Sequence, residues 1–143
     1  MTVTIPWLGI LVAVVVAFIA NFLWFGPKTF YPVWARALGK SPEEQPGGGQ
    51  SMGVTFGLTI LGSIVMAFTM SWLLQASAAL YKTSDVSPGS GALVGLLVGI
   101  GIAAAASLGH RLFAGQGLVV WLIEVGGDIL GLTLMGLVLS FFL

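Results

Sequence analysis

Four long apolar stretches constrain this chain more than any other feature of its sequence. They cover approximately residues 5–25, 52–74, 91–108 and 118–143. A helix needs about 20 predominantly apolar residues to cross the hydrocarbon core of a bilayer. Backbone groups in hydrocarbon must be hydrogen-bonded within their own segment, and no stretch alternates with the period of a strand, so helices are expected. The pattern predicts an all-α, polytopic membrane protein in which residues 1–143 form one four-helix bundle.

The low charge of the chain excludes most soluble alternatives. Only 7% of the residues are charged, whereas an ordinary soluble domain has about 25%. A soluble fold with so few charges would expose large apolar patches. Nucleic-acid binding is excluded as well, because it needs a basic face that this sequence cannot supply. Cysteine is absent, which excludes disulfides, thiolate metal sites and a cysteine nucleophile. The net charge is zero, so no acidic or basic soluble partner is indicated.

The five basic residues predict the orientation of the helices. Lys28, Arg36 and Lys40 lie between the first two stretches, and Arg111 lies between the last two. Lys82 is the one basic residue in the connection on the other side. The positive-inside rule therefore places both termini outside the cytoplasm, in the plasma (inner) membrane. The positions of the aromatic residues fit the same orientation. At the inner boundary we expect Trp24, Trp34 and Trp121, and at the outer boundary Trp7, Trp72 and Tyr81.

The segment from Lys28 to Lys40 predicts a short amphipathic helix between the first two spanning helices. Its apolar side chains, Phe30 and Trp34 among them, share one face, and its basic residues take the other. This pattern is typical of a helix in the headgroup layer that turns its bases towards anionic lipid; a specific lipid or partner site is the alternative. Residues 41–51 predict a flexible loop. The residues assigned to headgroups or orientation are Lys28, Trp34, Arg36, Lys40 and Arg111.

Glu124 and Asp128 are the sharpest chemical signal in the sequence. Because they are four residues apart, they share one face of the last predicted helix. A rise of about 1.5 Å per residue places Asp128 near the bilayer midplane. Acidic residues at that depth normally face the bundle interior or a water-filled cavity. Together with Asn21 and Ser107, the two carboxyls form a candidate path for a proton or an ion.

Two other interpretations of these acids stay open. In the first, both carboxyls are neutral and hydrogen-bonded to neighbouring helices, with Asn21 at the right depth for Glu124. Ser107 and Arg111 would then approach from the third helix. In the second, one acid is a docking charge that pairs with a base on another subunit.

Glycines recur at four-residue spacing in the last two apolar stretches. Small residues at this spacing allow the backbones of two membrane helices to approach closely. Packing within the chain is the favoured interpretation, and a homodimer face is the alternative. The glycines concerned are Gly91, Gly95 and Gly99 in the third stretch and Gly127 and Gly131 in the fourth.

Two short motifs resemble those of a known family. Residues 24–39 read W-F-G-P-K-T-F-Y-P-V-W-A-R-A-L-G and directly follow an apolar stretch. Residues 110–115 read H-R-L-F-A-G and precede the run Trp121-Leu122-Ile123 and a glycine-rich last stretch. Together they resemble a widespread bacterial family of small four-helix membrane proteins, catalogued only as a domain of unknown function.

This resemblance implies a membrane location and the four-span layout, and it implies no activity. The chain departs from the family pattern in its last span. Where the pattern has Asn and a Tyr-His pair, this sequence has Glu124 and the pair Gly127-Asp128. A polar role tied to those residue types is therefore not carried over.

No catalytic set is recognisable, so we expect neither an enzyme nor a bound cofactor or metal. The sequence lacks a Ser-His-Asp arrangement, a phosphate-binding glycine loop and zinc-ligand spacing. The leading hypothesis is an accessory or structural membrane subunit that acts by helix association. The alternative is a small oligomeric carrier or channel, coupled to protons or cations through Glu124 and Asp128. The expected partners are the lipid bilayer and a second copy or another membrane protein, but not nucleic acid.

Overall fold

The computed structural model describes residues 3–41, 44, 51–83 and 85–143, and the regular secondary structure in this part of the chain is all helical. Four helical segments are long and apolar enough to cross a membrane, which confirms the predicted all-helical, four-span architecture. The loop predicted for residues 41–51 lies almost wholly outside the described residues. The four segments are Trp7–Trp24, Met52–Leu80, Pro88–Phe113 and Leu118–Phe142.

The first span is helix α1 (Trp7–Trp24), and the second is helix α3 (Met52–Leu80). The short predicted helix between them forms as α2 (Tyr31–Ala37), with Pro32 in its first turn. The third span consists of three consecutive helical pieces, and the fourth ends in a short 3-10 turn. The third span comprises α4 (Pro88–Val98), the π-helix η1 (Gly99–Ala104) and α5 (Ala105–Phe113). The fourth comprises α6 (Leu118–Leu139) and the 3-10 turn η2 (Ser140–Phe142).

Two helix ends differ from the ends of the apolar stretches, and an N-cap accounts for one of them. The second span continues six residues past Leu74, to Leu80. The third begins at Pro88 instead of residue 91, because the Ser87 side chain accepts a hydrogen bond from the backbone N–H of Ser90. Such an N-cap, followed by proline at the first helical position, is a strong start signal for a helix.

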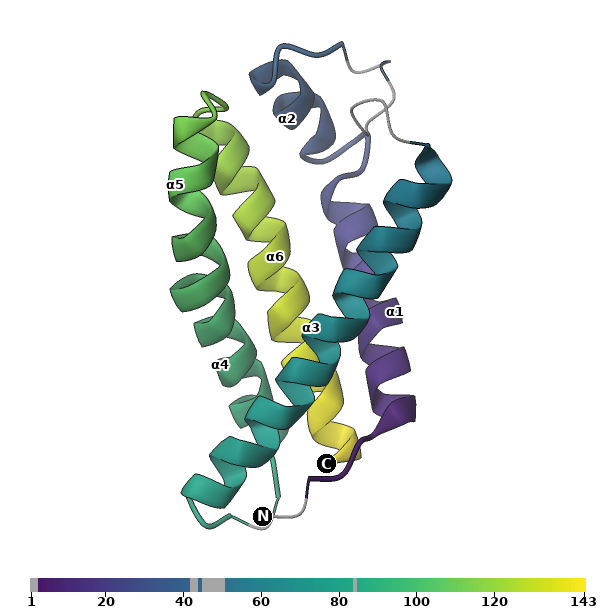
Figure 1. The fold of residues 1–143 in the computed structure, drawn as a ribbon, viewed down its shortest axis with the longest axis vertical. Helices are drawn as coiled ribbons and strands as arrows, with labels where there is room; N and C mark the ends of the chain where they lie inside the picture. Colours follow the sequence, from purple (N-terminus) through teal and green to yellow (C-terminus); the bar gives the residue numbers. More distant parts are fainter. Residues whose placement is uncertain (1–2, 42–43, 45–50, 84) are drawn as a thin grey trace.

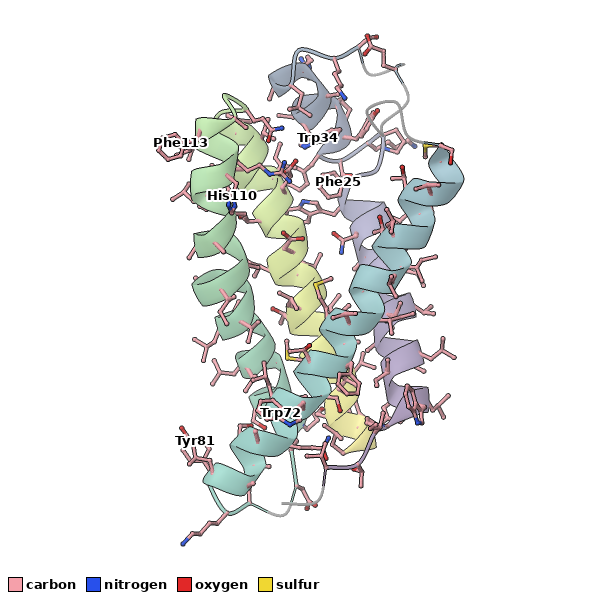
Figure 2. All side chains as sticks on the ribbon, viewed as in Figure 1. Phe25, Trp34, Trp72, Tyr81, His110 and Phe113 are labelled. Carbon is pink, nitrogen blue, oxygen red and sulfur yellow. The ribbon has the colours of Figure 1, made fainter. Side chains whose placement is uncertain are left out.

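Helix α6 is the central element of the bundle. It packs against α1, α3, α4, η1 and α5, and 44% of an apolar 18-residue window of this span is buried, against 11% for the window in α3. Helix α3 crosses the other spans at an angle, and α2 lies across the end of the bundle opposite the C-terminus (Figure 1). Aromatic residues lie at both ends of the bundle: Trp34 of α2 lies at one end, and Trp72 and Tyr81 lie at the other (Figure 2).

The tightest contacts of α6 are made through glycine. A Cβ added to Gly95 of α4 would collide with the backbone carbonyl oxygen of Leu132, and one added to Gly91 would collide with that of Gly136. On the opposite side of α6, a Cβ at Gly127 would lie 2.7 Å from the Oδ1 atom of Asn21 in α1. Small residues therefore let α6 approach both of its main neighbours within the same chain.

The remaining glycines of the predicted packing set follow the same rule. A Cβ at Gly99 would lie 2.9 Å from the Cα atom of Ile129, and one at Gly131 would lie 3.0 Å from Asn21 Nδ2. All five glycines thus lie at contacts between helices of one chain.

We predict that Gly95→Ala destabilises the protein by about 1–3 kcal/mol, because the new methyl group forces the α4 and α6 backbones apart. Gly62→Ala in α3 is the matched control, since a Cβ there meets nothing within 4 Å. The control is expected to be neutral or to stabilise by up to about 1 kcal/mol. Unfolding of both variants in mixed detergent micelles, followed by circular dichroism, measures the difference. Equal losses in both variants would contradict the role given to the α4–α6 contact.

Candidate functional site

The carboxylate of Glu124 holds three helices together. Its Oε1 atom accepts a hydrogen bond of 3.0 Å from Nε1 of Trp34 in α2. Its Oε2 atom lies 2.7 Å from Nε of Arg111 in α5, where the contact is an ion pair rather than a well-aligned hydrogen bond. The Glu124 side chain is only 19% exposed. One acid of α6 is therefore neutralised by the protein itself.

An aromatic cluster positions α2 for this contact. Nε1 of Trp24, at the end of α1, donates to the backbone oxygen of Ile123 at 2.9 Å. The Trp24 and Phe30 rings lie 4.3 Å apart, and the Phe25 and Trp34 rings meet edge to face at 6.0 Å. Figure 2 shows Phe25 and Trp34 together at the α2 end of the bundle. These ring contacts hold the indole N–H of Trp34 against α6.

The role of Trp34 and Arg111 at lipid headgroups or in orientation stays a prediction, and the structure adds a protein partner for both side chains. A helical wheel shows which face of α2 is apolar, but it does not distinguish lipid from protein as the neighbour of that face. The indole N–H of Trp34 is directed at Glu124, and the Arg111 guanidinium, although 40% exposed, pairs with the same carboxylate. Of the other basic residues in the set, Lys28 and Arg36 are exposed and Lys40 is half-buried.

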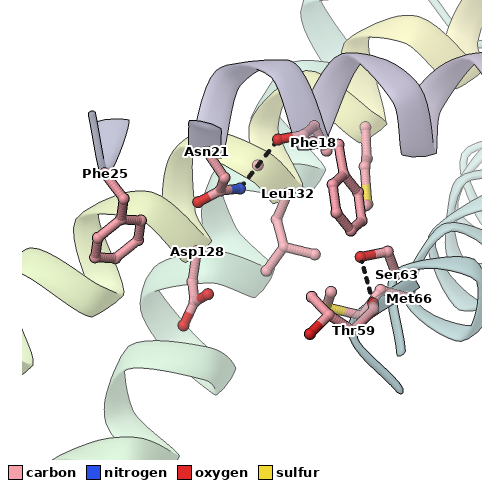
Figure 3. Close-up of a pocket in the computed structure, with 11 residues that line it drawn as sticks. Phe18, Asn21, Phe25, Thr59, Ser63, Met66, Asp128 and Leu132 are labelled. Carbon is pink, nitrogen blue, oxygen red and sulfur yellow. Dashed lines mark hydrogen bonds between the residues drawn. The ribbon is translucent and has the colours of Figure 1, made fainter. Parts of the chain in front are cut away.

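Asp128 lies one turn further along α6, in a different environment. It is an exposed residue and, within the described chain, has no hydrogen-bonding or ion-pair partner. It lines a pocket of about 300 Å³ between α1, α3 and α6. Figure 3 shows Asp128, Asn21 and Thr59 directed into this common space from the three helices.

Polar and apolar groups divide the lining of this pocket, which we call the Asp128 pocket. Asn21 comes from α1, Thr59 and Ser63 come from α3, and Asp128 comes from α6. The predicted partnership of Asn21 with Glu124 is corrected, because Asn21 lines the pocket beside Asp128 and donates through Nδ2 to the backbone oxygen of Ala17. The apolar part of the lining includes Phe18, Phe25, Met66, Leu132 and Met135.

Ser107 lies away from this pocket. Its Oγ atom donates to the backbone oxygen of Ala104 at 3.1 Å and accepts from Nε1 of Trp121 at 3.2 Å. The four residues of the predicted ion path are thus divided: Asn21 and Asp128 share a pocket, while Glu124 and Ser107 make other contacts.

Thr59 and Ser63 are pocket residues that the sequence analysis missed. A signal for them exists, since Thr55, Thr59 and Ser63 place hydroxyl groups four residues apart on one face of the second span. Hydroxyl side chains are common in membrane helices, where they bond to their own backbone. Their position beside Asp128 follows only from how α3 is rotated against α6.

The described residues contain no group of three or more His, Cys, Asp or Glu side chains arranged to hold a metal ion. The chemistry available at the Asp128 pocket is therefore that of one carboxylate, one amide and two hydroxyl groups beside an apolar wall.

Comparison with known proteins gives one match. The profile of a family described as "Protein of unknown function (DUF1761)" matches residues 8–140, which include Trp34, Glu124 and Asp128. This confirms the resemblance to a family of unknown function. No match was found among curated proteins or among solved structures.

We predict that Trp34→Phe destabilises the protein by about 1–3 kcal/mol, because it preserves the ring contacts but leaves a carboxylate oxygen of Glu124 without its donor. Trp7→Phe is the control, since Trp7 is 67% exposed at the start of α1. Its effect is expected to stay within about 0.5 kcal/mol. Unfolding in mixed micelles, followed by circular dichroism, compares the two variants. A Trp34→Phe protein as stable as the control would show that the hydrogen bond to Glu124 is dispensable.

Proposed function

The chain belongs to the DUF1761 family of proteins of unknown function, and we propose that it is a small, non-enzymatic membrane carrier or channel that binds a proton or cation at Asp128. The observation that carries this proposal is the unpaired carboxylate beside the Asp128 pocket, well inside the last span. An acidic side chain at such a depth is unfavourable by a few kcal/mol or more, and such residues commonly mark ion and substrate pathways.

The different surroundings of the two acids support one binding carboxylate rather than two. Glu124 already has a cationic partner in Arg111 and a donor in Trp34. Replacing these partners with a transported ion would break the contacts between α2, α5 and α6. Asp128 has no hydrogen-bonding or ion-pair partner within the described chain, and Arg111, whose charge also acts on it, is in direct contact with Glu124 instead. The Asp128 carboxyl is therefore available to a ligand.

The alternative, an accessory or structural subunit that acts by helix association, has less support. The glycines that would supply a close-packing face to another chain lie at helix contacts within this one. Helix α3 presents a long uncovered face, with 11% of its apolar 18-residue window buried. That face is apolar, and lipid covers such a surface as well as protein does. We therefore place carriage of a cation ahead of association alone.

We further propose that both termini lie outside the cytoplasm, in the plasma (inner) membrane. Arg111 shares the Glu124 carboxylate with Trp34 of α2, and three further basic residues lie at positions 28–40, in and around α2. Lys82 follows Tyr81, which lies at the opposite end (Figure 2). The positive-inside rule then favours a cytoplasmic α2.

The orientation predicts how single cysteine residues react in intact cells. The natural chain has no cysteine, so Tyr81→Cys and Val33→Cys each introduce one exposed thiol and keep all basic residues. A membrane-impermeant maleimide should label Tyr81→Cys in intact cells and Val33→Cys only after permeabilisation. The reverse result would mean that the termini are cytoplasmic.

The proposal also predicts that Asp128→Asn abolishes cation flux in proteoliposomes, because the amide carries no charge to bind a proton or cation. Proton, sodium and potassium flux would each be measured in the wild-type protein and the variant, with circular dichroism as a check on folding. Asp85→Asn, the same change in the connection between α3 and α4, should conduct as the wild type does. A wild-type protein without flux, or an Asp128→Asn variant with full flux, would contradict the proposal.

A further inference from the structure

The polar atoms of the Asp128 pocket act mainly as hydrogen-bond acceptors. The Thr59 hydroxyl donates to the backbone oxygen of Thr55 at 2.7 Å, and the Ser63 hydroxyl donates to that of Thr59 at 3.0 Å. A hydroxyl group has a single hydrogen, so each of these oxygens accepts from a ligand as long as its bond to the backbone is kept. The carboxyl group of Asp128, in its ionised form, accepts without donating. The pocket therefore suits a ligand that brings its own N–H or O–H donors.

Asn21 adds a further acceptor. One hydrogen of its Nδ2 atom donates to the backbone oxygen of Ala17 at 3.1 Å, and its Oδ1 atom can accept at the pocket beside the second N–H. Four acceptor groups, contributed by three helices, thus surround a space with one carboxyl group. A donor with a single positive charge complements this arrangement.

The size and walls of the pocket favour an organic cation over a bare metal ion. A volume of about 300 Å³ is far larger than the share of one water molecule, about 30 Å³, and lies at the lower end of ligand pockets. Hard metal cations need about six or more close oxygen ligands. Much of this lining is instead apolar, as Phe18, Met66 and Leu132 illustrate.

Aromatic rings add a second feature that favours a cation. Phe18 of α1 and Phe25, which directly follows α1, line the pocket, and in Figure 3 they lie on opposite sides of Asp128. The face of an aromatic ring attracts a cation electrostatically, most strongly where water is excluded. Hydrocarbon attached to the cation would also contact these rings and leave water.

We propose that the Asp128 pocket binds a primary alkylammonium ion. Its N–H groups donate to Asp128 and to the oxygens of Asn21 and Thr59, while its alkyl chain packs against the apolar wall. This inference rests on the proposed function, because it names the class of cation that Asp128 holds. The acceptor pattern sets the specificity: a quaternary ammonium ion has the charge without N–H donors, and an alcohol has a donor without the charge.

The inference is tested by equilibrium binding to the full-length protein in lipid nanodiscs, with empty nanodiscs subtracted to correct for partitioning into lipid. The probes are n-hexylammonium, n-hexyltrimethylammonium, n-hexanol and sodium ion. We expect saturable binding of n-hexylammonium, at least about tenfold weaker binding of the trimethyl analogue, and no saturable binding of n-hexanol, because ionic hydrogen bonds are lost in both analogues.

Two variants locate the binding site. Asp128→Asn should weaken n-hexylammonium binding by about tenfold or more, and Thr59→Val should weaken it by about two- to tenfold, since one acceptor is removed with little change of shape. Asp85→Asn, outside the pocket, should bind as the wild type does. If Asp128→Asn does not fold, the comparison of the four probes on wild-type protein still decides the question.

The possible outcomes separate this inference from the proposed function. Binding of n-hexylammonium no stronger than that of n-hexanol, or unchanged by Asp128→Asn, would overturn the inference. If proton or sodium flux still depends on Asp128 in that case, the proposed function stands and only the class of cation is wrong. If neither ammonium binding nor cation flux is found, both proposals fail.

Discussion

The direct backbone contact between α4 and α6 is the constraint on which the rest of the structure depends. Lipid is as apolar as the helix surfaces, so spans associate through close packing rather than through the hydrophobic effect. Gly91 and Gly95 permit that packing on one side of α6, and Gly127 and Gly131 permit it on the other. Helix α6 thereby becomes the central helix, and each acidic residue that it carries must face a neighbouring helix or a space between helices.

The two acids of α6 show how one turn of helix separates two kinds of chemistry. Near the end of the bundle, Glu124 meets residues from α2 and α5 that carry a donor and a positive charge. One turn deeper, α1 and α3 offer Asp128 only an amide and hydroxyl groups whose hydrogens bond to backbone oxygens. The first acid connects elements of the fold, and the second leaves an unmatched charge beside a pocket.

The sequence predicts the spans and the short helix between the first two because apolar length and amphipathic spacing are local properties. It also predicts that Asp128 lies near the bilayer midplane, because depth follows from the position of a residue along its own apolar stretch. The partners of the two acids depend instead on how the helices rotate against one another, which no single stretch encodes. Spacing along one stretch therefore does not show that Asn21, Thr59 and Ser63 line a pocket beside Asp128, or that the indole N–H of Trp34 meets Glu124.

The π-helical segment η1 has a consequence for the ion pair of Glu124. Buried positions on the third span recur every four residues at Gly91, Gly95 and Gly99, and then after five at Ala104. The wider turn accommodates one extra residue, which shifts the phase of α5 by about 100° relative to an uninterrupted α-helix. Without that shift, Arg111 would point about a quarter-turn away from α6. The counter-charge of Glu124 is thus brought into register by an irregularity of the backbone on a neighbouring helix.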